Sequence, residues 1–96
     1  SMQSNPTKLE SLNQTIKKYN AALVSAKQGR DDLAIIQLKK VISLNPHFVK
    51  ALQLLALLYM KNGETEKAVK VEYFTVATVW LPKSQIQLSE EEKKES

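Results

Sequence analysis

The fold is decided by the stretch from Tyr19 to Pro46, which reads YNAALVSAKQGRDDLAIIQLKKVISLNP. Two apolar-rich halves are separated by Gly29, and the stretch is closed by Pro46. Glycine ends helices because it adopts the left-handed backbone conformation without a steric cost. Proline disfavours helical geometry at the residue before it, here Asn45. The pattern therefore predicts a hairpin of two helices that ends near Asn45.

Both halves carry apolar residues at helical spacing. Around the first half the apolar positions are Leu12, Ile16, Tyr19, Leu23 and Ala26. In the second half they are Leu33, Ala34, Ile35, Leu38, Val41 and Ile42. Steps of roughly three and four residues place such positions on one side of a helix. Asp31 or Asp32 is expected to cap the second helix by accepting hydrogen bonds from its first backbone N–H groups.

The same pattern recurs further along the chain. Gly29 and Gly63 are 34 residues apart. The identities at this offset are Ala22 with Ala56, Leu23 with Leu57, Lys27 with Lys61, and Ala34 with Ala68. The chain holds only two glycines, so their agreement with this register is not easily a chance event. The spacing predicts the duplication of one helical hairpin.

These residues resemble the tetratricopeptide repeat family over about residues 15–71. Ala22 with Ala34, and Ala56 with Ala68, match the small residues that let the two helices of a repeat approach closely. Gly29 and Gly63 match the turn inside the hairpin, and Pro46 matches the proline that ends a repeat. The resemblance implies an all-α fold of about one and a half antiparallel helical hairpins.

The second copy departs from the family pattern after Val71. Glu72 and Thr75 stand where the family has apolar or small residues, and Pro82 comes two residues late. The segment 73–88 is also rich in β-branched and aromatic residues, which are typical of strands. Two alternatives remain open: a capping helix that continues to about Trp80, with Val71, Thr75, Val79 and Trp80 packed inward, or a short β excursion.

The composition excludes most enzyme classes. The chain has 96 residues, no cysteine, one histidine and two glycines. These numbers leave no thiol nucleophile, too few ligands for an ordinary metal site, and no glycine-rich loop for a phosphate. We expect no catalytic residue, no metal and no cofactor, and thus no enzyme. His47 is expected to be a surface or capping residue, and the pair Asp31 and Asp32 a helix cap rather than an acid–base pair.

The charge is mildly basic, with a formal net charge of +4. Arg30 is the only arginine among the 14 cationic residues, and the lysines are scattered. Binders of nucleic acid usually rely on arginine forks and stacked aromatic residues. Nucleic acid is therefore an unlikely partner, and a weak nucleic-acid binder is the third of the functional hypotheses.

The family resemblance implies a protein-interaction scaffold that binds a peptide in a concave groove lined by the first helix of each repeat. Carried over position by position, the groove residues are Ile16, Tyr19, Leu23, Lys27, Lys50, Gln53, Leu57, Met60 and Lys61. An apolar strip edged by lysines suits a short amphipathic segment with acidic ends. The family's clamp for C-terminal carboxylates is not expected, because Tyr19, Leu23 and Gln53 replace its lysine and asparagine set.

An alternative is that the same apolar residues are core, covered by the lead-in over residues 8–12 or by a second copy of the chain. A chain of one and a half repeats lacks a neighbour for its last apolar face, which favours a partner and makes a homodimer without a peptide ligand the second hypothesis.

The predicted boundaries follow from composition. Residues 1–7 are expected to be a disordered lead-in that includes a tag scar at Ser1 and Met2, residues 8–80 the helical domain, and residues 81–96 a charged tail. No apolar run approaches the roughly 18 residues that a membrane-spanning helix needs. With no visible signal peptide, the expected compartment is the cytoplasm.

Overall fold

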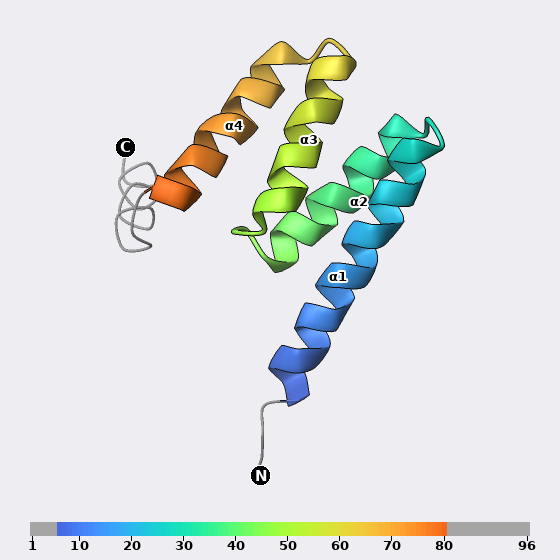
Figure 1. Cartoon of the computed structure of the whole chain (residues 1–96), viewed down its shortest axis with the longest axis vertical. Coiled ribbons are helices and arrows are strands. Elements are labelled where there is room, and N and C mark those ends of the chain that lie inside the picture. Colours follow the sequence, from blue (N-terminus) through green and yellow to red (C-terminus); the bar gives the residue numbers. More distant parts are fainter. Residues whose placement is uncertain (1–5, 81–96) are drawn as a thin grey trace.

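The computed structural model describes residues 6–80, which form four helices joined by short turns (Figure 1). The helices are α1 (Pro6–Lys27), α2 (Asp31–Leu44), α3 (Val49–Lys61) and α4 (Thr65–Trp80). Residues 6–80 contain no strand. The predicted all-α fold is confirmed.

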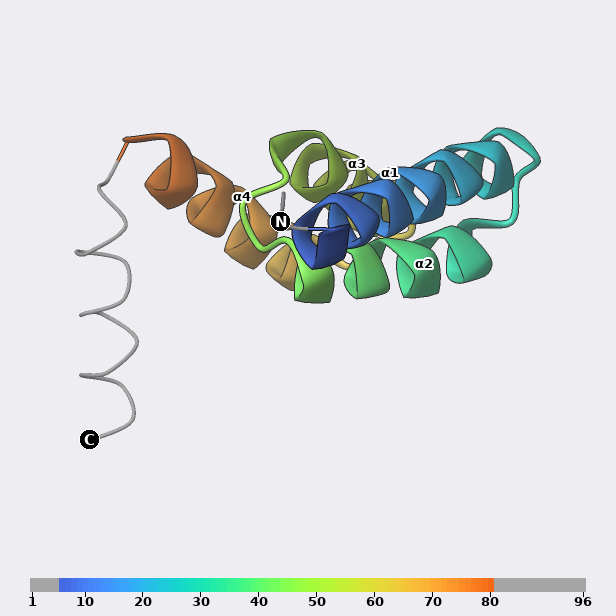
Figure 2. The same cartoon turned by 90° about the horizontal axis from the view of Figure 1, so that it is seen from below.

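The helices pair as two consecutive hairpins. α1 packs on α2, α3 packs on α4, and α2 also packs on α3, so that α2 joins the hairpins. α1 and α3 lie on one side of the molecule and α2 on the other (Figure 2). α1 is longer than its partner and extends well past the end of α2 (Figure 1). This arrangement is a stack of hairpins, in which each hairpin contacts only its neighbour in sequence.

The two hairpin turns have the same geometry. Gly29 and Gly63 both take a positive φ, of 78° and 80°. After α1, the N–H of Arg30 donates to the carbonyl of Ser25 at 2.9 Å, and the N–H of Gly29 donates to that of Ala26 at 3.0 Å. The residues 34 positions later repeat both bonds, at 2.8 and 3.1 Å. This pair of bonds is the Schellman motif, in which glycine supplies the left-handed residue.

Replacing Gly29 by alanine is expected to lower the free energy of unfolding by about 1 kcal/mol, because an L side chain is strained at positive φ. A Cβ built at Gly29 meets nothing within 4 Å, so the loss is conformational and not steric. Gly29→Asn is the control, since asparagine tolerates this conformation better than alanine. Urea unfolding measures both variants, and an alanine variant as stable as wild type would contradict the assignment.

Small residues sit where the helices of each hairpin meet. Ala22, Ala34 and Ala68 are fully buried, and Ala56 is nearly so. Around them the core cluster is completed by Leu38, Val41, Ala51, Leu55, Leu58 and Tyr59. The residues that the repeat pattern predicted to allow close approach are therefore the ones excluded from solvent.

One equivalent core position holds different residues in the two hairpins. Tyr59 on α3 is buried, whereas Ser25 holds the same place on α1, 34 residues earlier. Ser25 is also buried, and its hydroxyl lies 2.7 Å from the side-chain oxygen of Gln37 on α2. A buried hydroxyl needs such a partner, because leaving it without one costs about 1–3 kcal/mol.

The start of α2 differs from the prediction. Neither Asp31 nor Asp32 is the cap: α2 begins at Asp31, and the residue before it, Arg30, makes no side-chain capping bond. Both carboxylates lie instead in the first helical turn, where the positive end of the helix dipole stabilises their negative charge. The predicted stop is confirmed, since α2 ends at Leu44 and Asn45 takes an extended conformation before Pro46.

α4 is helical through Trp80, so of the two alternatives the helix is confirmed for residues 73–80 and the β excursion is wrong there. Packing of α4 against α3, and against the turn that precedes α3, outweighs the strand-like composition of residues 73–80. Val71 packs against the core, Phe74 stacks on His47 at 6.4 Å between ring centroids, and the Thr75 hydroxyl donates to the carbonyl of Val71 at 2.8 Å. Residues 81–88 lie outside the described range.

The expectation that Val79 and Trp80 pack inward is wrong. Val79 is 59% exposed and Trp80 is 76% exposed. The inward side of α4 holds Ala68, Val71, Phe74 and Thr75. Val79 follows Thr75 by four residues on the same side of the helix, yet it is exposed. Trp80 lies on the side of α4 that no other helix within residues 6–80 covers.

Candidate functional site

The predicted groove residues come from α1 and α3, the two helices on one side of the molecule (Figure 2). Three of its apolar residues are open to solvent: Ile16 is 43% exposed, Leu57 63% and Met60 52%. Tyr19 and Leu23 are half-buried. The polar residues of the set are all exposed, namely Lys27, Lys50, Gln53 and Lys61.

Tyr19 is half-buried and also contributes to the packing between the hairpins. Its ring stacks on Phe48, with 5.1 Å between ring centroids and 28° between planes. Phe48 immediately precedes α3, so this stack joins the two hairpins at the side where the groove residues lie. Sequence reasoning missed Phe48, although an aromatic residue directly after Pro46 and before an apolar helix was the available signal.

The lead-in does not cover the groove residues. Residues 8–12 continue α1 in one helix, so they cannot fold back over Ile16 (Figure 1). Leu9 and Leu12 are 61% and 49% exposed, and with Ile16 they form a stripe at steps of three and four residues. The interpretation that residues 8–12 bury this face is therefore wrong, and Leu9 and Leu12 extend the exposed apolar strip.

Lys61 links the two hairpin turns. Its ammonium lies 3.2 Å from the Oδ2 atom of Asp31, and the side-chain amide of Asn62 donates to the same oxygen at 3.0 Å. The hydrogen bond from Asn62 holds the pKa of Asp31 below its ordinary value, and Lys61 lowers it further. Lys61, which was predicted at the edge of the groove, thus also holds the end of α3 against the start of α2. No local sequence pattern indicated this contact.

Acidification is expected to weaken this link. Because the folded-state pKa of Asp31 is depressed, its stabilisation is fully present above the unfolded-state pKa, about 3.9, and is lost as the pH falls through the folded-state value. Asp31→Asn should therefore lose less stability than wild type between about pH 5 and about pH 3. Thermal unfolding across this range measures the difference. The matched control is Asp32→Asn, which removes a neighbouring carboxylate but keeps the contacts of Asp31 with Lys61 and Asn62.

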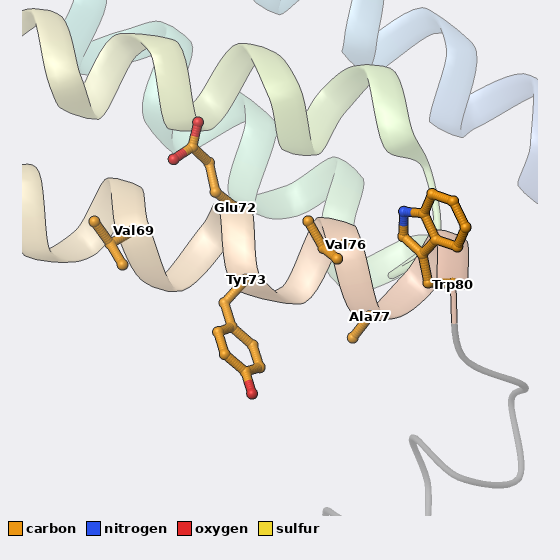
Figure 3. Close-up of a pocket in the computed structure, with 6 residues that line it drawn as sticks. All are labelled: Val69, Glu72, Tyr73, Val76, Ala77 and Trp80. Carbon is orange, nitrogen blue, oxygen red and sulfur yellow. The ribbon is translucent and has the colours of Figure 1, made fainter.

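Two surface hollows lie away from the predicted groove. One, of about 510 Å³, lies on α4 and is lined there by Val69, Glu72, Tyr73, Val76, Ala77 and Trp80 (Figure 3). The other, of about 350 Å³, is polar and is lined by Gln14, Lys17, Lys18, Ala21, Gln37 and Lys40 of α1 and α2. Neither hollow contains a predicted groove residue.

The stacked hairpins define a helical-repeat protein. Two sequence models of the tetratricopeptide repeat match the chain, one over residues 18–48 and the other over residues 38–70. Together they span more than half of the 96 residues, and the chain belongs to the tetratricopeptide repeat family. The matches stop at residue 70, just before the departures at Glu72 and Thr75. No curated protein and no solved structure matches the chain.

Membership in this family makes the chain a protein-interaction scaffold, with proteins as its partners. None of the helices between Pro6 and Trp80 combines the length and apolar character needed to cross a membrane. Within the same residues, no three histidine, aspartate or glutamate side chains gather as metal ligands would.

Proposed function

We propose that the exposed face of α1 and α3 binds a short amphipathic peptide segment with an apolar centre and acidic ends. The observation that carries the proposal is the exposure of Ile16, Leu57 and Met60 in a folded chain. Apolar residues that stay open in a folded domain often mark interaction sites. For this face the segment 8–12 provides no cover, because it continues α1.

The edges of the face support the acidic ends. Lys27, Lys50 and Lys61 are exposed and belong to the same two helices. Lysines at the rim attract acidic residues, act mainly on the association rate, and are screened by salt. Lys61 already contacts Asp31, so an acidic residue of the peptide would share this cation. Lys27 and Lys50 therefore carry most of the charge selection.

A pair of synthetic helical peptides tests the proposal. Both carry leucines at helical spacing and a fluorescent label, and they differ only in glutamates or lysines at the ends. Binding is measured by fluorescence anisotropy. The glutamate peptide is expected to bind more tightly, and added salt is expected to reduce the difference. Equal affinity for both peptides would contradict the role of the lysines.

Leu57→Glu is expected to weaken binding of the glutamate peptide by at least about tenfold, because it places a charge at the centre of the apolar strip and repels the acidic ends. The matched control is Ile36→Glu, since Ile36 on α2 is similarly exposed at 54% but lies outside the strip. Unchanged binding by Leu57→Glu would refute the site. A tight, salt-insensitive dimer that buries Tyr19 and Leu57 would also refute it.

A further inference from the structure

The first hairpin carries a polar hollow between α1 and α2, with a volume of about 350 Å³. Three of the residues that line it are lysines: Lys17 and Lys18 on α1, and Lys40 on α2. Lys17 and Lys40 are exposed, and Lys18 is half-buried. The other lining residues are Gln14, Ala21 and Gln37. We call these six residues the basic hollow.

The internal repeat shows what the same position does in the second hairpin. The residues 34 places after those of the basic hollow are all apolar, namely Phe48, Ala51, Leu52, Leu55, Val71 and Phe74. Ala51, Leu52 and Leu55 are buried. Phe48 stacks on Tyr19 of the first hairpin, and α3 packs on α2. In the second hairpin, therefore, this position is the surface on which another helix packs.

The first hairpin keeps this position and changes its chemistry. The buried apolar residues Ala51 and Leu52 of the second hairpin correspond to Lys17 and Lys18. An apolar helix packed there would bury lysine charges without partners, which is costly. A helix that brings carboxylates would instead neutralise them. The position therefore suits an acidic helix and disfavours an apolar one.

Hydrogen bonding adds to the preference for an acceptor-rich ligand. The hydroxyl of Ser25 donates to the Oε1 atom of Gln37 at 2.7 Å. With this oxygen engaged, Gln37 offers its amide N–H groups, which are donors. The lysine ammonium groups are donors only. Ser25 is particular to the first hairpin, because Tyr59 stands 34 residues later. Carboxylates, which accept several hydrogen bonds, match this set of donors.

The chain itself does not neutralise the basic hollow. Within residues 6–80, no carboxylate lines the hollow, and the two ion pairs shown there involve none of its lysines. Glu10 lies seven residues before Lys17 on α1, and Asp32 lies eight residues before Lys40 on α2. These positions are about 10 Å and about 12 Å apart along the helix axes. Both separations exceed the screening length of about 8 Å at physiological salt.

We propose that the basic hollow binds an acidic helical segment of a protein partner, in the place that α2 takes beside α3. Carboxylates of the segment contact Lys17, Lys18 and Lys40. Nucleic acid fits the hollow less well, because neither arginine nor an aromatic residue is among the residues that line it. The hollow shares no residue with the peptide site proposed on α1 and α3, so the two proposals stand separately.

A labelled, alanine-based helical peptide with glutamates on one face tests the binding. A matched peptide carries glutamines at the same places. Neither peptide contains leucine, so neither presents the apolar centre proposed for the face of α1 and α3. Fluorescence anisotropy at low salt should show binding of the glutamate peptide only, and added salt should weaken it. Equal binding of the two peptides, or no binding of either, would overturn the proposal.

A pair of triple variants with the same net charge locates the binding. The hollow variant combines Lys17→Gln, Lys18→Gln and Lys40→Gln. The control combines the same change at three exposed lysines outside the hollow, which are Lys8→Gln, Lys67→Gln and Lys70→Gln. The hollow variant should bind the glutamate peptide about tenfold more weakly than wild type, and the control should bind as wild type does. Equal losses would mean unspecific attraction and would overturn the proposal.

Charge reversal gives a readout that a loss of structure cannot imitate. Lys17→Glu combined with Lys40→Glu should prefer a peptide with lysines in place of the glutamates. A preference that stays with the glutamate peptide would overturn the proposal. So would a labelled single-stranded oligonucleotide that binds wild type more tightly than the glutamate peptide and loses this affinity in the hollow variant.

Leu57→Gln separates this surface from the peptide site on α1 and α3. This variant alters the apolar strip and leaves the basic hollow unchanged, so it should bind the alanine-based glutamate peptide as wild type does. A loss of binding comparable to that of the hollow variant would place the peptide on the apolar strip and overturn the proposal.

Discussion

Replacing Leu38 by alanine is expected to lower the free energy of unfolding by about 3 kcal/mol. Leu38 is fully buried, with an exposed fraction of 0%, and it is among the largest fully buried side chains. It lies on α2, the helix that packs on both α1 and α3, so its removal leaves a cavity where the two hairpins share their core. The loss combines the transfer free energy of the deleted carbons with the cost of that cavity.

The thermal midpoint should fall by roughly 12–24 °C, because about 1 kcal/mol corresponds to about 4–8 °C in a domain of this size. Leu33→Ala is the matched control, since the same change is made on the same helix at a residue that is 39% exposed. Leu33→Ala should lose clearly less free energy of unfolding than Leu38→Ala. Circular dichroism during heating and urea unfolding measure both variants. Equal losses at the two positions would mean that Leu38 is not at the centre of the core.

Replacing Ala34 by leucine is expected to lower the free energy of unfolding by about 2 kcal/mol. Ala34 on α2 and Ala22 on α1 are both fully buried, and both belong to the core cluster. A small residue there lets the two helices approach closely. A leucine adds three carbon atoms to a packed interior, so the helices must separate or neighbouring side chains must leave their preferred rotamers.

Ala21→Leu provides the control for this prediction. Ala21 is exposed on α1, so the larger side chain meets solvent there, and leucine is nearly as good a helix former as alanine. The control should remain within about 0.5 kcal/mol of wild type in urea unfolding. If Ala34→Leu were as stable as the control, the interpretation that Ala34 permits the close approach of α1 and α2 would be wrong.

Most of the hairpin arrangement could be predicted from the sequence because its signals are local. Gly29 and Gly63 end the first helix of each hairpin, and each does so through backbone bonds within a few residues. Pro46 restricts Asn45 in the same local way, and α2 ends there as predicted. The buried alanines followed from the agreement of two copies at one offset.

The candidate site was predictable only as a set of positions on two helices. Helical spacing placed Ile16 and Leu57 on the predicted strip, and both are exposed. The stack of Tyr19 on Phe48, and the contact of Lys61 with Asp31, join residues that are far apart in sequence. Such contacts depend on how the hairpins pack, so no local pattern could indicate them.

The open alternatives at α4, and the wrong expectation for Trp80, have the same origin. Residues 73–80 have a strand-like composition, yet they are helical because Val71, Phe74 and Thr75 gain contacts that only the neighbouring elements supply. Propensity differences of a few tenths of a kcal/mol per residue are smaller than the gain from burying one large side chain. Trp80 is exposed for the complementary reason, since no described helix lies on its side.

By itself, the sequence determined that this protein is built from two similar helical hairpins, where each turn falls, and which small residues let helices meet. These features depend on backbone conformation and on spacing along one helix. Only the tertiary structure decided which apolar residues are covered, because burial depends on which helices lie beside one another. That decision separates the core around Leu38 from the open faces of α1, α3 and α4.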